Sequence, residues 1–162
     1  MRTITTLLGC ALMLLSGASM AENLVGSIVP PYPEGFRDGG GACISKALGD
    51  KNICQYSLGI LRRRGEHLLY LGKSAPRIDP KKARWTVTDQ LSIKDVPRGH
   101  DISFGLCEQN GVQDETILAI VKITDTDWFT NVHSAYKVNL TTERFEKIPT
   151  KGIRCLNEGW GA

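Results

Sequence analysis

The chain lacks the motifs that would identify an activity. It contains neither the GxSxG turn of serine hydrolases nor the HExxH helix of zinc proteases. Its formal net charge of +3 is far below the basic balance that is typical of nucleic-acid-binding domains. We therefore expect no catalytic residue, no cofactor, no metal site and no nucleic-acid partner.

Apolar runs long enough to span a membrane are also missing. The apolar residues 7–15 fall short of the roughly 18–20 residues that a bilayer requires. They follow Arg2, and Ser19 and Ala21 are small residues at the two positions that a signal peptidase reads. We expect residues 1–21 to be a signal peptide that is cleaved after Ala21, and the mature protein to be periplasmic or secreted.

The leader also contains a possible lipidation site. Leu7-Leu8-Gly9-Cys10 resembles a bacterial lipobox, and a lipidated Cys10 would anchor the protein to a membrane. The apolar run before Cys10 is short and continues well past it. We therefore favour cleavage after Ala21 over a lipid anchor.

Four cysteines remain after the leader: Cys43, Cys54, Cys107 and Cys155. An even number in an exported chain is typical of two disulfides, for which three pairings are possible. We favour Cys43–Cys54, which closes a short loop, and Cys107–Cys155, which joins two predicted strand ends. Zinc is the alternative, but the closely spaced CxxC pairs that structural zinc prefers are missing.

About 140 residues follow the leader, which is enough for one domain with an ordinary core. Residues 22–41 contain three prolines and five glycines and cannot hold a helix, so we expect an extended N-terminal arm. Residues 42–162 are expected to form a single disulfide-linked, β-rich domain.

The pattern of residues 42–162 is mainly that of β-strands. Residues 56–63 and 67–71 flank a tight turn, residues 136–148 read as a hairpin, and residues 116–124 are apolar on both faces, which is typical of a central strand. Short helices are expected in residues 42–48 and after Asp127, which can cap a helix. The predicted fold is mainly β or α+β, an antiparallel sheet or a small sandwich or barrel with one or two short helices.

Two features are candidates for contact with a partner. Arg62-Arg63-Arg64, beside the predicted turn, is the densest positive run and suits an anionic glycan, lipid headgroups or an acidic partner. A solvated turn that protects an edge strand is the simpler interpretation, and we favour it. Trp160, between two glycines, either packs back on the sheet or is presented outward.

The histidines do not form a recognisable catalytic group. Hydrolytic chemistry often needs a histidine beside a nucleophile or a carboxylate. His100 and Asp101 are neighbours, but adjacent side chains of a strand point to opposite faces. We therefore expect His67, His100 and His133 to lie at the surface.

One resemblance rests on Trp128 and on residues 135–140, 144–145 and 153–159. This part of the chain resembles small exported proteins of Gram-negative bacteria without an assigned function. The resemblance implies a setting in the bacterial envelope and no particular activity.

These observations together predict an exported, non-enzymatic protein-binding domain of the inhibitor, immunity or envelope-adaptor type, with a protein partner of unknown identity. An inhibitor would insert a loop into a cleft, and the arginine turn and Trp160 are the candidates. One alternative is a glycan- or lipid-binding envelope module that uses Arg62–Arg64. Another is a small hydrolase that uses a carboxylate near His100 or His133.

Overall fold

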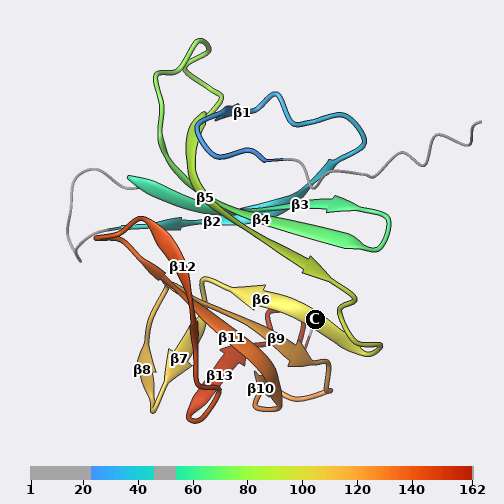
Figure 1. The fold of residues 1–162 in the computed structure, drawn as a ribbon. Coiled ribbons are helices and arrows are strands. Elements are labelled where there is room, and N and C mark those ends of the chain that lie inside the picture. The colour runs from blue at the N-terminus through green and yellow to red at the C-terminus, as the bar shows by residue number, and fades with distance from the viewer. Residues whose placement is uncertain (1–22, 46–53, 162) are drawn as a thin grey trace, which may run out of the picture.

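The structure is a computed structural model that describes residues 23–45 and 54–161, so the predicted signal peptide and Cys10 lie outside the described residues. The described residues form β-strands and no helix (Figure 1). The mainly β, antiparallel fold predicted from the sequence is therefore confirmed. None of these residues belongs to a helix that could cross a membrane.

The strands form three antiparallel sheets. One sheet has the order β1-β5-β4-β3-β2, the second β12-β11-β9-β6 and the third β10-β13-β7-β8. Their bounds are β1 (Ile28–Val29), β2 (Arg37–Ile44), β3 (Tyr56–Arg63), β4 (Glu66–Ser74), β5 (Trp85–Lys94), β6 (His100–Phe104), β7 (Cys107–Gln109), β8 (Val112–Gln113), β9 (Ile117–Lys122), β10 (Trp128–Phe129), β11 (Val132–Asn139), β12 (Arg144–Ile148) and β13 (Ile153–Leu156).

The core lies between the two larger sheets. Leu58 and Ile60 of β3 point to this side, where they pack in one cluster with Leu118 and Ile120 of β9. Because side chains alternate across a strand, β3 and β9 each bury a second set of residues on their other face. β9 lies between β6 and β11, so its predicted central position is confirmed.

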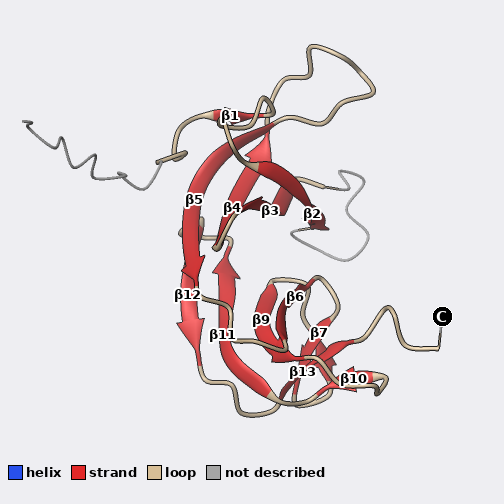
Figure 2. Ribbon diagram, turned by 90° about the vertical axis from the view of Figure 1, so that its right-hand side faces the viewer, coloured by secondary structure: helices blue, strands red, loops and turns tan. Residues whose placement is uncertain are grey.

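One side of the two larger sheets is closed. β12 lies beside β5, and the Phe145 N–H donates to Oδ2 of Asp89 at 2.8 Å. The two sheets curve along this side into a half-barrel (Figure 2). The edge of β12 is therefore covered by a side chain from the other sheet.

The N-terminal segment packs on the domain instead of standing away from it as an arm. Leu24, Val29 and Phe36 are buried against Leu61 and Tyr70 on the outer face of the five-stranded sheet. Residues 23–36 contain turns and the two-residue strand β1, and residues 37–41 already belong to β2. The few large apolar residues of the segment were the signal for this burial, because covering them removes apolar surface from water.

Both predicted disulfides are present. Cys43 of β2 is bonded to Cys54, and Cys107 of β7 is bonded to Cys155, its cross-strand partner in β13. The second disulfide is fully buried between the small sheet and the outer face of β9. Two disulfides indicate an oxidising compartment outside the cytoplasm.

The predicted short helices are not found in the described residues. Residues 42–44 belong to β2, and residues 46–48 lie outside the described part of the chain. After Asp127, Trp128 and Phe129 pair with Leu156 and Cys155 of β13. The helix prediction was wrong here because pairing with a strand from the far end of the domain outweighs a local capping preference.

Candidate functional site

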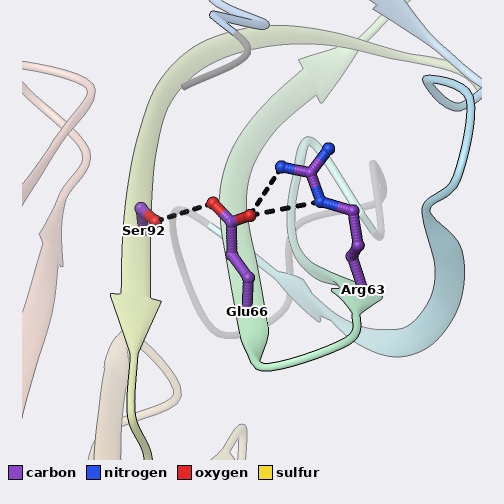
Figure 3. Close-up of polar contacts among 3 residues, drawn as sticks. All are labelled: Arg63, Glu66 and Ser92. Atoms are coloured by element: carbon purple, nitrogen blue, oxygen red, sulfur yellow. Dashed lines mark hydrogen bonds and ion pairs between the residues drawn. The ribbon is translucent and has the colours of Figure 1, made fainter. Parts of the chain in front are cut away.

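Arg63 is occupied by contacts within the domain. Its Nε and Nη2 lie 3.2 and 2.6 Å from Oε2 of Glu66, and Oε1 of Glu66 accepts a hydrogen bond from Ser92 at 3.1 Å (Figure 3). The guanidinium also lies over the ring of Phe36 at 4.3 Å. The hydrogen bonds from Arg63 lower the pKa of the Glu66 carboxyl, which therefore stays charged. Glu66 thus links the β3–β4 hairpin to β5, and Arg63 links it to the N-terminal segment.

Arg62 points to the opposite face of β3, because neighbouring side chains of a strand alternate. Its Nη2 lies 3.9 Å from Oδ1 of Asp101 in β6, and both side chains are about half exposed (47% and 57%). An exposed pair at this distance adds little stability. Arg64 is exposed in the turn, where no carboxylate of the described residues lies within ion-pair distance. The three arginines therefore do not form one continuous binding patch.

His67 is half-buried, unlike the exposed position expected for all three histidines. It pairs with Arg62 across the β3–β4 ladder, and its Nδ1 is the one buried side-chain polar atom of the described residues that has no hydrogen-bond partner. Burial and the Arg62 guanidinium lower the pKa of His67 below 6.5, and Asp101 partly offsets this. The fold thus favours the neutral imidazole.

This environment predicts a pH dependence of stability. When the pH falls below the unfolded-state pKa of about 6.5, the unfolded chain binds a proton at His67 before the folded chain does, so the free energy of unfolding decreases. His67→Gln should therefore lose less stability than the wild type between pH 7.5 and pH 5.5 in urea unfolding. His133→Gln, at an exposed site, should behave like the wild type. Equal pH dependence in His67→Gln and the wild type would contradict this.

A groove lies between β6 and the residues that follow β13. It has a volume of about 340 Å³. Its apolar lining includes Val121, Phe129 and Leu156, and its acidic lining consists of Asp101 and Glu158. Four strands, β6, β9, β10 and β13, meet here with the residues that follow β13. No local pattern in the sequence marks this groove, because its residues converge only in the folded chain.

Trp160 stands two residues beyond Glu158 and is presented outward, with 55% of its surface exposed. The preceding turn holds it there. The Trp160 N–H donates to the Asn157 carbonyl at 3.1 Å, and the Asn157 amide donates to the Thr126 carbonyl at 2.9 Å. Trp85 and Trp128 differ from it: both are partly buried, and the Arg154 guanidinium lies 4.2 Å from the Trp128 ring centre. Trp160 is therefore the tryptophan available for contact.

His100 and His133 are brought together, with their ring centres 5.7 Å apart in an edge-on arrangement. His100 Nδ1 lies 3.3 Å from the Arg98 carbonyl oxygen. Within residues 23–45 and 54–161, no three histidine, cysteine, aspartate or glutamate side chains are placed to hold a metal ion. The two rings lie next to each other without a carboxylate hydrogen bond to orient either of them in the described structure.

The fold defines a class, that of small all-β domains with two disulfides. No protein-family model matches the chain, and neither a curated protein nor a solved structure matches it. Its function is therefore inferred from its own residues.

Proposed function

We propose that the protein is an exported, non-enzymatic binding domain that engages another protein through the groove beside β6 and the neighbouring Trp160. Its place of action would be the periplasm or the extracellular medium, after removal of residues 1–21. The observation that carries this proposal is the outward Trp160, two residues beyond Glu158 of an open groove whose lining includes Phe129 and Leu156. Tryptophan is enriched among the residues that dominate binding energies in protein interfaces.

The scaffold also suits binding. The groove is built on β-strands, and the buried Cys107–Cys155 disulfide lies in the sheet that forms one wall. A rigid surface loses little conformational entropy when a partner docks, and this favours affinity. The alternative glycan- or lipid-binding module draws less support, because Arg63 is bound to Glu66 and lies on the opposite face from Arg62.

The experiment is affinity capture of the oxidised, exported protein from an envelope extract, followed by identification of any stoichiometric partner. With that partner purified, Trp160→Ala should weaken binding about 30-fold, which is the effect of losing one dominant interface residue. Titration calorimetry would measure it. The substitution removes an exposed side chain, so the fold should not change.

Ile78→Ala is the matched control. Ile78 is 82% exposed and lies in the loop between β4 and β5, and this loop extends from the five-stranded sheet away from the C-terminus (Figure 1). This variant should bind like the wild type. Retention of the exported protein on peptidoglycan or anionic lipid instead, with affinity lost on neutralising Arg62 and Arg64, would overturn the proposal in favour of the glycan- or lipid-binding module.

A further inference from the structure

β6 forms an open edge of its sheet. It pairs with β9 alone. The Ile123 N–H donates to the Gly99 carbonyl at 2.9 Å, and hydrogen-bonded pairs recur every second residue along an antiparallel ladder. The backbone N–H and C=O groups of Asp101 and Ser103 therefore point toward β9. Those of the alternate residues of β6 point away from it.

The outward groups belong to His100, Ile102 and Phe104, and the His100 N–H donates to the Pro97 carbonyl at 3.0 Å. The Ile102 N–H donates to the Asp101 carboxylate at 2.8 Å, which satisfies this donor in the absence of a neighbouring strand. Within the described residues, no strand pairs with this edge. The remaining outward carbonyl and amide groups are spaced for another strand, and an unpaired row of this kind is a template for strand addition.

The other edges of the described sheets are less suited to an added strand. β5 of the other sheet lies beside β12, and its Asp89 accepts a hydrogen bond from the Phe145 N–H, so a strand of this chain already occupies that side. β1, β8 and β10 each have two residues. β2 is interrupted by a register shift between Asp38 and Gly41. β6 borders the groove with four successive residues, from Asp101 to Phe104, whereas the edge strand β10 contributes Phe129 alone.

The groove lining indicates which side chains an added strand would carry. Asp101 and Glu158 are carboxylates, and Val121, Phe129 and Leu156 are apolar. Arg62 offsets Asp101 weakly, because that pair is exposed and 3.9 Å apart. Since side chains of a strand alternate in direction, a segment that alternates basic and apolar residues would place its basic residues on the side of Asp101 and its apolar residues on the opposite side, beside Ile102 and Phe104.

We infer that β6 recruits an extended segment of the partner, with alternating basic and apolar residues, by β-strand addition. This inference rests on the proposed binding function and names the partner's chemistry. The incoming strand replaces the Asp101 carboxylate as the acceptor for the Ile102 N–H. The carboxylate so released then pairs with a lysine or arginine of the added strand.

The test uses a capped eight-residue peptide that alternates lysine and valine, with the oxidised, exported protein. Amide hydrogen exchange measured by NMR should slow at Ile102 and Phe104 when the peptide is added. A peptide N-methylated at alternate residues, on the edge that would face β6, should lose this protection because it cannot donate the strand hydrogen bonds. An alternating glutamate and valine peptide should not protect these amides.

A pair of isosteric substitutions tests the charges. Asp101→Asn combined with Glu158→Gln should weaken binding of the lysine peptide about fivefold, as expected for two exposed charge pairs. Glu146→Gln on β12, at the opposite edge of the same sheet, removes one carboxylate away from the groove and should leave the affinity unchanged. An equal loss in Glu146→Gln would show general charge attraction and overturn the inference.

Different results would overturn strand addition at β6 and the proposed binding function. Unchanged exchange at Ile102 and Phe104 with millimolar lysine peptide, or equal binding of the methylated peptide, overturns strand addition at β6. If a captured partner is still lost with Trp160→Ala in that case, the binding function stands and uses another contact. Absence of any Trp160-dependent partner would overturn the function itself.

Discussion

Replacing Cys107 and Cys155 together by alanine is expected to lower the free energy of unfolding by about 4 kcal/mol. The disulfide joins residues 48 positions apart, and by the chain-entropy model a loop of this length costs the unfolded chain about that much conformational freedom. The bond is fully buried among Ile117, Ala119 and Ile153, so its loss also reduces packing there. Urea unfolding of the two oxidised proteins would measure the difference.

The other disulfide provides the comparison. Cys43 and Cys54 are 11 positions apart, so replacing both by alanine should cost about 3 kcal/mol by the same model. A smaller loss for the longer loop, or a loss below about 1 kcal/mol for either pair, would contradict an entropic origin of the stabilisation.

The second large effect is expected at Gly59. Gly59 lies directly opposite Tyr70 in the β3–β4 ladder, and the Tyr70 ring covers it so closely that a Cβ at position 59 would overlap the ring. Gly59→Ala should therefore cost about 3 kcal/mol, because the buried ring has to leave its well-packed position. Thermal and urea unfolding would both report the loss.

A double substitution identifies the cause. Gly59→Ala should cost less than half as much in a Tyr70→Leu background, since the side chain that overlaps the new methyl group is then smaller. Gly159→Ala is the matched control, because a Cβ there makes only ordinary contact with Asn157 and the effect should be within about 0.5 kcal/mol. Additive costs at positions 59 and 70 would contradict the steric explanation.

Local patterns explain why β3 and β9 were predictable from the sequence. Residues 117–121 are apolar on both faces, and such a run is stable only with material on both sides, whereas residues 56–63 were recognised as a strand from the tight turn that follows them. The tight turn at residues 64–65 is also local, because Gly65 readily adopts the positive φ of 71° that the hairpin requires. The two cysteine pairs were predictable because one loop was short and the other joined two strand ends.

The segments around Asp127 and before β2 show where local reasoning was insufficient. Asp127 has the chemistry of a helix cap, but β13 offers Trp128 and Phe129 a strand partner, and ladder pairing with burial exceeds the roughly 1 kcal/mol of a cap. Prolines and glycines in residues 22–41 excluded a helix correctly. They carried no information on whether Leu24 and Phe36 would find an apolar face to cover.

The sequence by itself determined the fold class, the two disulfides and the central strand β9, because each depends on residue type, spacing or periodicity along the chain. Only the tertiary structure decided which candidates could act together. It separated Arg63 from Arg62 by the two faces of one strand, turned Trp160 outward and formed the groove from β6, β9, β10 and the C-terminal segment. Such a site consists of contacts between residues far apart in the chain, and these contacts depend on how sheets pack, for which no short stretch of sequence carries a signal.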